Sequence, residues 1–334
     1  MKRPVLSLFF LLLLIVGTFF ILRNAKSKQY MQLSGKAFGT IYHITYHSSR
    51  PLQQEVEATL QQVDATFSMF NPHSLVARIN AGADTTLNDA FIEVFDMAQQ
   101  VSEQTQGAFD ITVAPLVNAW GFGTKGERQP SQQQIDSLLQ CVGYGKVKLH
   151  GQRLQRTDKR LQLDFSAIAK GYACDALAHM MRHNGVDNFM IEIGGEVVCQ
   201  GVNEKGKRWR IAVQQPKENA SEDQEYQAIL TLCDQAVATS GNYRNFYYKD
   251  GRRYAHTIDP HTGRPVQHSL LSATVVAPQC ARADAYATAF MVMGLQKAQQ
   301  FMQQHADLQA LLVYEDAQGR LLTWATPKLK KAMQ

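Results

Sequence analysis

Apolar side chains recur at helical spacing in several segments of the chain. Between residues 52 and 67 they fall three or four positions apart with Gln and Glu between them, and the pattern returns over 88–104. This spacing gathers the apolar side chains on one face, so both segments are predicted to be amphipathic helices. Further helices are predicted at 131–139, 167–182 and 280–293.

Short apolar runs bounded by turn residues alternate with these helices and predict strands. The predicted strands lie at 146–149, 161–164, 189–193, 209–213, 228–232 and 273–276, and a closing hairpin pairs 311–314 with 321–324. Because successive strands are joined by short turns, the sequence favours an α+β fold in which helices flank a mixed, largely antiparallel sheet. No linker divides this body, so residues 24–334 are expected to form a single domain.

The N-terminus carries a different pattern. Lys2 and Arg3 precede an almost uninterrupted apolar stretch over 4–22. At about 1.5 Å rise per residue this stretch comes close to the roughly 30 Å of a bilayer core, so one membrane-spanning helix, an uncleaved signal anchor, is predicted within residues 1–23. A cleaved signal peptide and a buried core helix are the alternatives. The positive flank would place the rest of the chain on the periplasmic side of the inner membrane.

Charge and cysteine content exclude other classes of protein. The chain has 34 Lys and Arg against 29 Asp and Glu, and three of the bases lie in the first 23 residues. The remaining body carries 31 bases and 29 acids, which gives no basic stripe for a nucleic acid. The five cysteines include no C-x-x-C pair and no neighbouring His, so neither a zinc site nor a redox motif is supported.

Four segments carry more Gly, polar and charged residues than a core requires. Residues 107–113 are either the C-cap and turn of a helix or a loop that brings Asp110 to a ligand. Residues 163–173 lead an apolar strand into a helix, whose N-terminus either binds an anion through its N–H groups or is capped by Asp164 or Ser166. The residues themselves leave these alternatives open.

The other two segments are 191–196, a strand that ends in Gly-Gly between two acids, and 254–265, which contains an Asp-Pro-His-Thr-Gly turn. His256 lies just before that turn, where a general base could reach a bound substrate. On the following helix Asp284 and Thr288 stand four residues apart and share a face, so their oxygens suit a hard cation such as Mg²⁺. A solvated Asp beside a helical Thr is the alternative.

Together these motifs resemble the ApbE family of FAD:protein FMN transferases. The resemblance spans about residues 34–325 and includes GAFDITV with PLVNAWGFG, LDFSAIAKGYACD, IGGE, ATSGNYR, YAHTIDPHTGRPV and ADAYATA. It implies an ApbE-like fold for the body of the chain. It also implies a Mg²⁺-dependent enzyme that takes FAD as substrate, attaches FMN through a phosphoester to a Ser or Thr hydroxyl of an acceptor protein and releases AMP.

The resemblance further implies a role for individual residues. His256 would be the general base, and Asp284 and Thr288 would hold Mg²⁺ together with the main-chain carbonyl of Ala167. The positions that would contact the flavin substrate are Phe38, Phe70, Ala108, Phe109, Asp110, Asp164, Lys170 and Ile258.

Two other functions use the same motifs. The first is a flavin-processing hydrolase, an FAD pyrophosphatase that gives FMN and AMP with water in place of the hydroxyl. The second is a flavin-binding protein without chemistry, which would not need His256, Asp284 and Thr288. For the transferase, the expected partners are subunits of membrane electron-transfer or ion-pumping complexes that carry an Asp-Gly-x-Ser/Thr-Gly/Ala-Thr type motif. An anchored enzyme would meet them in the plane of the membrane.

Overall fold

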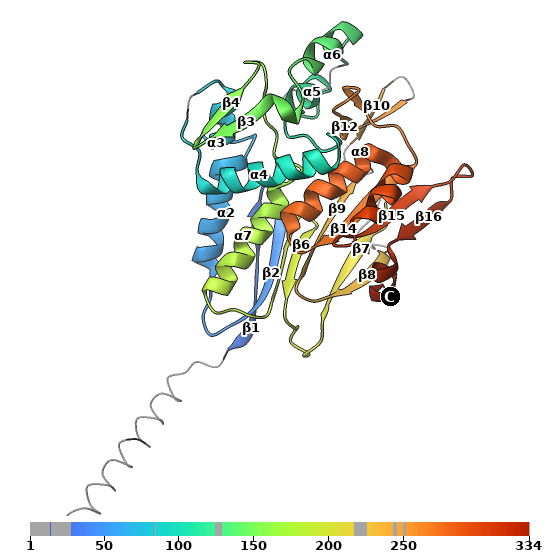
Figure 1. Ribbon diagram of the computed structural model, residues 1–334. Coiled ribbons are helices and arrows are strands. Elements are labelled where there is room, and N and C mark those ends of the chain that lie inside the picture. The colour runs from blue at the N-terminus through green and yellow to red at the C-terminus, as the bar shows by residue number, and fades with distance from the viewer. Residues whose placement is uncertain are drawn as a thin grey trace, which may run out of the picture.

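The computed structural model describes Leu14 and residues 28–83, 85–123, 129–216, 226–242, 246–249 and 252–333. Its centre is an eight-stranded sheet in which every neighbouring pair of strands is antiparallel (Figure 1). In spatial order the strands are β1 (Gln29–Ala37), β2 (Thr40–Ser48), β5 (Phe189–Ile193), β6 (Glu196–Gln200), β9 (Gln235–Gly241), β14 (Leu270–Ala277), β15 (Gln309–Glu315) and β16 (Leu321–Ala325). The predicted α+β fold with a largely antiparallel sheet is thereby confirmed.

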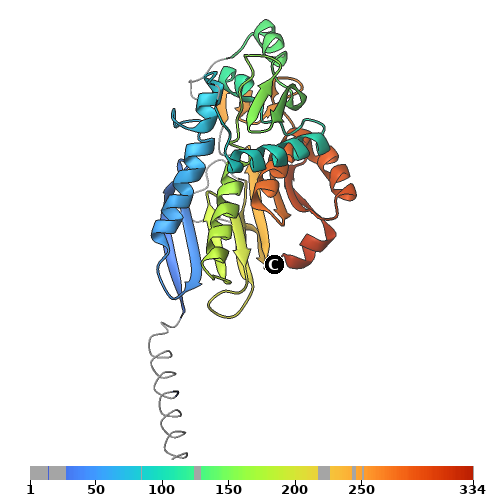
Figure 2. The same cartoon turned by 60° about the vertical axis from the view of Figure 1, so that its left-hand side comes forward.

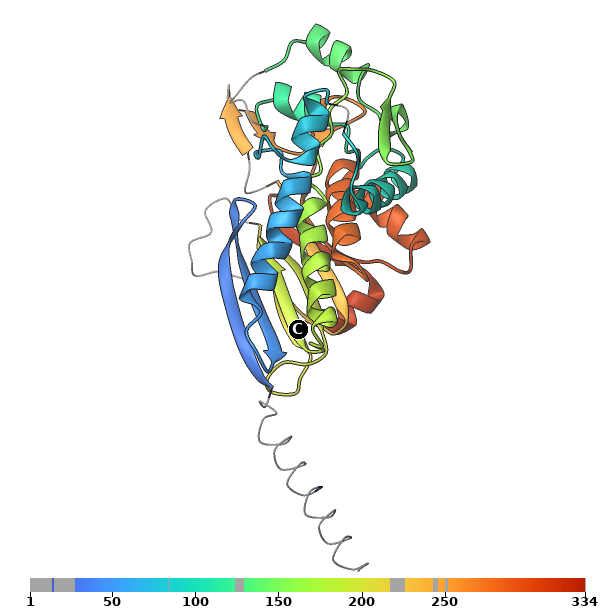
Figure 3. The same cartoon turned by 90° about the vertical axis from the view of Figure 1, so that its left-hand side faces the viewer.

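Helices cover one face of this sheet. The views in Figures 2 and 3 show α2 over the β1–β2 edge with α7 beside it, and α4 crossing near the upper end. Alternate strand residues such as Ile44, Ile191 and Val275 are fully buried beneath the helices, as expected for one face of a pleated strand. The helices of this layer are α2 (Gln53–Phe67), α4 (Asp89–Gln104), α7 (Ala169–His183) and α8 (Cys280–Gln304).

The opposite face of the sheet is covered over β6, β9, β14 and β15. There the alternate residues Val197, Val237 and Leu311 pack into a second apolar cluster. The elements that close this cluster are β7 (Trp209–Gln214), β8 (Tyr226–Leu232) and α9 (Pro327–Ala332). Both faces of the sheet are therefore buried over these strands, one by the helices and the other by β7, β8 and α9.

Smaller elements gather at one end of the sheet, the upper end in Figure 1. The antiparallel registers bring the β1–β2 turn, the β5–β6 turn and the end of β9 to a common end of the sheet. The remaining elements are α3 (Leu75–Asn80), α5 (Ala114–Ala119), α6 (Gln132–Leu139), the 3-10 turn η1 (Tyr144–Lys146), β3 (Val147–His150), β4 (Arg153–Arg156), β10 (Phe246–Lys249), β11 (Arg252–Ala255), β12 (Ile258–Asp259) and β13 (Arg264–Pro265).

All five predicted helices are confirmed, and four of them agree with the structure within about two residues at both ends, whereas α8 continues past the predicted end to Gln304. Asn88 caps α4 by accepting a hydrogen bond from the Phe91 N–H, and Ser131 with Gln134 forms a capping box at the start of α6. The predicted end of the last helix at residue 293 coincides with a break in α8, because Gly294 has a non-helical φ of 74°.

The predicted strand at 161–164 is wrong. Gln162 makes a single parallel bridge to Val113, and the segment joins no sheet in the described part of the chain. The side chain of Asn80 replaces a neighbouring strand there, because it accepts a hydrogen bond from the Leu163 N–H and donates one to the Leu163 carbonyl, each at 2.8 Å. The apolar run therefore reflects burial under the helices and not strand pairing.

The expected membrane span at 4–22 lies outside the described residues, apart from Leu14. Across the part of the chain that is described, the model contains no helix of the length and apolar character needed to cross a bilayer.

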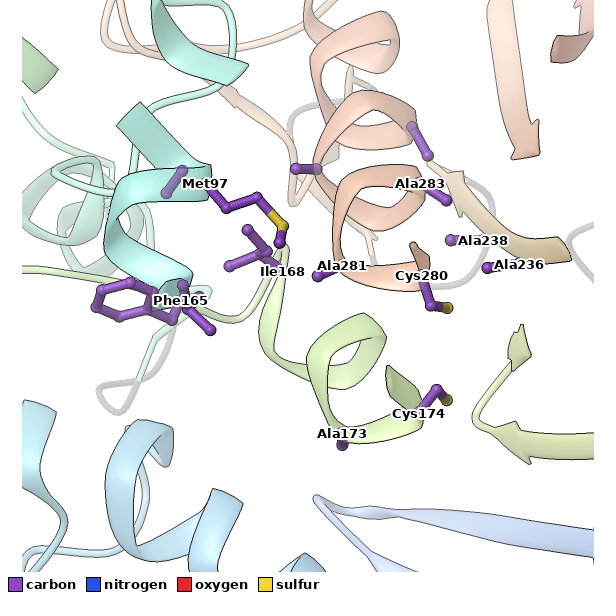
Figure 4. Packing of buried hydrophobic residues seen from close by; sticks show 14 of the residues in the cluster. Met97, Phe165, Ile168, Ala173, Cys174, Ala236, Ala238, Cys280, Ala281 and Ala283 are labelled. Carbon is purple, nitrogen blue, oxygen red and sulfur yellow. The ribbon is translucent and has the colours of Figure 1, made fainter. Parts of the chain in front are cut away.

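Helices α7 and α8 approach each other very closely. An added Cβ at Gly171 would lie 2.4 Å from the Cys280 carbonyl oxygen and 2.7 Å from the Cα of Ala281. Figure 4 shows Cys174 and Cys280 next to one another at this contact, each fully buried. Only a residue without a side chain permits this spacing.

Replacement of Gly171 is therefore a test of the contact. Because an added methyl group overpacks the interface, Gly171→Ala is expected to lower the free energy of unfolding by about 1–3 kcal/mol. Denaturant unfolding of the variant measures this change. Gly145→Ala is the control, since nothing lies within 4 Å of a Cβ added there, and its stability is expected to stay near that of the unmodified chain. Equal stability of the two variants would contradict the described packing.

Candidate active site

A cavity of about 870 Å³ opens among the elements at this end of the sheet. It brings together residues from separate parts of the chain, and all but one of the predicted site residues line it. They are Phe70, Ala108, Phe109, Asp110, Asp164, Ala167, Lys170, His256, Ile258, Asp284 and Thr288. A smaller cavity of about 590 Å³ near α9 contains none of them.

Phe38 is the predicted residue that does not line the cavity. It occupies the β1–β2 turn with a positive φ of 51°, and its half-buried ring packs against the main core. Thr40 and Ile41, which follow it, do line the cavity. Phe70 lies in the loop after α2 and is 75% exposed, while Ile41 is 51% exposed, so the rim carries large apolar side chains open to solvent.

The loop at 107–113 serves as a helix end and as a wall of the cavity. Gly107 has a φ of 84°, and its N–H donates to the Ser102 carbonyl, which ends α4. The carboxylate of Asp110 accepts hydrogen bonds from the N–H and the hydroxyl of Thr112 and from the Tyr144 N–H, each at 2.7 Å. Burial raises the pKa of Asp110, and these hydrogen bonds oppose the rise. The Asp110 side chain therefore links the loop at 107–113 to the 3-10 turn η1 through Tyr144.

The turn that leads into α7 does not have the side-chain cap that was one of the two alternatives for this segment. Neither Asp164 nor Ser166 caps it, because the residue at the cap position is Ile168, without a side-chain hydrogen bond. Asp164 instead accepts a hydrogen bond from the Ser166 N–H at 2.8 Å within the preceding turn. The result is a tight loop that presents Ala167 to the cavity, directly before the helix.

A cluster of charged side chains lies where α7 meets β6 and α8. The ammonium group of Lys170 donates to Glu196 Oε1 at 2.5 Å, and the N–H of Gly171 donates to Asp284 Oδ2 at 3.1 Å. The two acids are each only 3% exposed. Three charges therefore share one buried corner of the cavity.

The surroundings shift the pKa of each group in this cluster. Burial raises the pKa of Asp284, an effect that Lys170 opposes. Burial raises the pKa of Glu196 to about 7; Lys170 opposes the rise and the Asp284 charge adds to it. Burial alone would lower the pKa of Lys170, but Asp284 and Glu196 together hold it above its ordinary value. The ammonium group therefore stays charged, and each carboxylate is costly to ionise.

The start of α8 is fixed by α7. The carboxylate of Asp175 accepts hydrogen bonds from the N–H groups of Cys280 and Ala281, each at 2.9 Å. One turn further along α8, Asp284 and Thr288 face the cavity, and the hydroxyl of Thr288 lies 3.1 Å from that of Ser240 at the end of β9. The predicted shared face of these two residues is thus present.

The donors available for a cation are hard oxygens. Asp284 offers a buried carboxylate and Thr288 a hydroxyl, and Ala167 lines the same cavity. This donor chemistry fits Mg²⁺, which takes few protein oxygens and completes its coordination with water or phosphate oxygens. Within the described ranges there is no group of three or more His, Cys, Asp or Glu side chains arranged for a metal.

His256 lies between β11 and β12, directly before the turn as predicted, and contacts an aromatic side chain. The ring of Phe122 meets it edge to face with centroids 6.4 Å apart. The next residue, Thr257, donates its hydroxyl hydrogen to Asn242 Oδ1 at 2.7 Å. The following turn is anchored as well, because the Trp120 indole N–H donates to the Gly263 carbonyl at 2.7 Å. The histidine loop is thus fixed on both sides.

Several residues that line the cavity were given no role by the sequence. Glu196 belongs to the IGGE segment, where the acid after Gly-Gly was a visible signal, and Ser240 belongs to ATSGNYR. Arg210 and Tyr226 also line the cavity, from β7 and β8. Nothing in the local pattern of those strands marks them as site residues.

Comparison with known proteins supports the resemblance to the ApbE family. A family model described as the ApbE family matches residues 38–312. The FAD:protein FMN transferases of Klebsiella pneumoniae (strain 342) and Escherichia coli (strain K12) are each 34% identical to the chain over 314 residues, covering 89% of it and 88% of the relative.

Solved structures of flavin transferases have the same fold as this chain. The flavin transferase ApbE from Vibrio cholerae superposes with a TM-score of 0.82 at 32% identity, covering 91% of this chain and 99% of that one. The apo form of the Pseudomonas stutzeri flavinyl transferase ApbE gives 0.81 at 33%, covering 92% and 98%. The fold is therefore that of the flavin transferases. The chain belongs to the ApbE family, which confirms the resemblance of its motifs and the prediction of an enzyme of this class.

The contact between Asp175 and α8 can be tested by stability. Asp175→Ala leaves two N–H groups at the helix start without their acceptor, so the free energy of unfolding is expected to fall by about 1–3 kcal/mol. Thermal or denaturant unfolding without ligand measures this loss. Asp96→Ala, at an exposed position of α4, is the matched control and is expected to change stability little. A loss of the same size in the control would argue against a specific role for Asp175.

Proposed function

We propose that this enzyme transfers FMN from FAD to a Thr or Ser hydroxyl of an acceptor protein and releases AMP, in a Mg²⁺-dependent reaction. The observation that supports this most is the common cavity. Residues from separate motifs, among them His256, Lys170 and Asp284, line one space although they lie far apart in the sequence. A transferase needs a base, a cationic group and a metal-binding oxygen set together, and the cavity contains candidates for each.

The chemistry of the transfer defines what each residue does. The acceptor oxygen forms a bond to the phosphorus of the FMN half, and the bond from that phosphorus to the bridging oxygen breaks. AMP leaves with the bridging oxygen. The proton of the hydroxyl passes to a ring nitrogen of His256, because a hydroxyl is a weak nucleophile until a base removes its proton. Lys170 lies in the same cavity and offers its ammonium group to the anionic pyrophosphate.

Asp284 and Thr288 would hold Mg²⁺, with the main-chain carbonyl of Ala167 as a further oxygen. When bound there, Mg²⁺ would supply positive charge next to the phosphate oxygens. The residues that line the cavity and would contact the flavin substrate are Phe70, Ala108, Phe109, Asp110, Asp164, Lys170 and Ile258. Phe38 would contribute from the β1–β2 turn, next to Thr40 and Ile41 of the cavity wall. The exposed ring of Phe70 at the rim suits contact with a flat aromatic ligand.

The proposal also includes the cellular location of the enzyme and its acceptor proteins. Residues 1–23 would anchor the protein in the inner membrane and residues 24–334 would form the transferase domain on the periplasmic side. The apolar stretch over 4–22 supports the anchor by its length. The acceptors would be subunits of membrane electron-transfer or ion-pumping complexes with an Asp-Gly-x-Ser/Thr-Gly/Ala-Thr type motif.

The direct test uses the full chain in detergent with FAD, Mg²⁺ and a small protein that carries this motif. Denaturing gel fluorescence and intact mass measure whether the acceptor gains one FMN, and whether EDTA prevents it. Release of free FMN and AMP with an unlabelled acceptor would instead identify a hydrolase. Binding of FAD without turnover would identify a flavin-binding protein.

His256→Ala tests the base. Because a base acts in the transition state and contributes little to binding of the ground state, the rate of transfer is expected to fall roughly 10²- to 10⁴-fold while FAD affinity stays nearly unchanged. Single-turnover labelling and FAD titration measure the two quantities. The control is His179→Ala, an exposed position on α7, which is expected to leave both unchanged. Loss of FAD affinity equal to the loss of rate would contradict the assignment.

Asp284→Asn tests the metal-binding role. Loss of the carboxylate charge weakens the attraction for a divalent cation, so the Mg²⁺ concentration needed for half-maximal transfer is expected to rise at least roughly tenfold. A Mg²⁺ titration of the transfer rate measures this shift. Activity that falls by the same factor at every Mg²⁺ concentration would mean that Asp284 acts in another way.

A further inference from the structure

Glu196 is the member of the charged cluster to which the proposed function gives no role. It is the first residue of β6 and follows the turn at Gly194 and Gly195, whose φ values of 62° and 105° favour glycine. This turn delivers the side chain to the cavity, where it lies with Lys170 and Asp284. Its position is therefore set by rigid elements on both sides.

The two oxygens of this carboxylate are used unequally. Oε1 accepts the hydrogen bond from the Lys170 ammonium group at 2.5 Å. Oε2 is buried and has no hydrogen-bond partner within the described residues, and because the side chain is only 4% exposed, bulk solvent does not supply one. A buried carboxylate oxygen without a partner costs free energy, and native structures rarely keep one unless a ligand completes it.

The charge of the cluster indicates what kind of ligand completes it. With all three groups ionised, Glu196 and Asp284 against Lys170 leave one net negative charge in a buried corner. A neutral donor would satisfy Oε2 but would leave this charge uncompensated, and the corner would then repel the anionic pyrophosphate of FAD. A divalent cation changes the net charge from −1 to +1, which attracts a pyrophosphate.

We propose that Oε2 of Glu196 is a further oxygen ligand of the divalent cation assigned to Asp284 and Thr288, with Lys170 holding the Glu196 carboxylate in place through Oε1. The inference rests on the proposed function for the identity of the substrate and the cation. A second carboxylate suits the site because hard cations prefer anionic oxygen ligands. It also gives the cation a ligand from the sheet in addition to those from α8.

Binding of Mn²⁺, used as a probe for Mg²⁺, tests the inference without catalysis. Electron paramagnetic resonance of free Mn²⁺ measures its affinity for the full chain in detergent, without and with FAD. Glu196→Gln keeps the shape of the side chain and an acceptor for Lys170, but it removes the charge. Its Mn²⁺ affinity is expected to fall roughly 10- to 100-fold.

Glu192→Gln is the matched control. Glu192 lines the same cavity from the other side of the Gly-Gly turn, and its Oε1 accepts the Gly195 N–H at 2.7 Å. Its replacement makes the same change in charge and is expected to leave Mn²⁺ affinity nearly unchanged. Unchanged affinity in Glu196→Gln, or an equal loss in both variants, would overturn the inference.

A second variant reports on direct contact with the metal. Thiolates bind soft cations, so Glu196→Cys is expected to show a thiolate-to-Cd²⁺ ultraviolet absorption band beyond the background that the five free cysteines of the unmodified chain give. Absence of this band in a folded variant that still binds Cd²⁺ would count against ligation.

The outcomes of these experiments also separate the inference about Glu196 from the proposed function. Mn²⁺ binding that depends on Glu196 in a protein without FMN transfer supports the inference and refutes the function, whereas transfer with Mn²⁺ binding insensitive to Glu196 does the reverse.

Discussion

The site depends on the close approach of α7 to the start of α8. Because Gly171 has no side chain, the backbone of Cys280 can lie against it, and at this spacing the Gly171 N–H reaches Asp284. Asp175 ties the first N–H groups of α8 to the same helix. A wider spacing would separate the acid on α8 from Lys170, and the buried charges would lose the neighbours that make them tolerable.

The antiparallel sheet supplies the other half of the site. Its registers place the β5–β6 turn beside the end of β9, so Glu196 and Ser240 enter the cavity from neighbouring strands. Ser240 then contacts Thr288, which links the sheet to α8 a second time. The cluster of Lys170, Glu196 and Asp284 is therefore held by helices and strands, whereas the loops that carry Asp110, Asp164 and His256 complete the wall of the cavity.

The sequence predicted the parts of the fold whose pattern is local. The helix at 52–67 was visible because one face of it packs on the core, and β2 shows the same kind of signal in the alternation of Tyr42, Ile44 and Tyr46, although it was not predicted. Its partner β1 buries no residue, so no period-two pattern marks it. The error at 161–164 has the opposite cause, since burial there does not require strand pairing.

In the candidate site, too, the sequence predicted what a local pattern or motif shows, and missed what depends on tertiary packing. Asp284 and Thr288 share a helix face, so spacing alone could relate them, and the motifs related His256 to them by resemblance. The bond between Lys170 and Glu196 could not be predicted, because it joins residues from a helix and a strand that only the tertiary packing brings together. Likewise, the sequence marked Asp110 as a candidate for ligand contact, but it could not show that the carboxylate also accepts hydrogen bonds from Thr112 and Tyr144.

The contrast between the buried corner and the rim bears on the choice between transfer and hydrolysis. Water competes with the acceptor hydroxyl wherever it can reach the phosphorus, and a charged corner shielded by helices limits its approach from one side. On the other side Ile41 and Phe70 are 51% and 75% exposed, and exposed apolar side chains beside a cavity favour contact with another apolar surface. In the proposed reaction the acceptor would thus do more than supply a hydroxyl: by covering this rim it would exclude the water that otherwise takes its place.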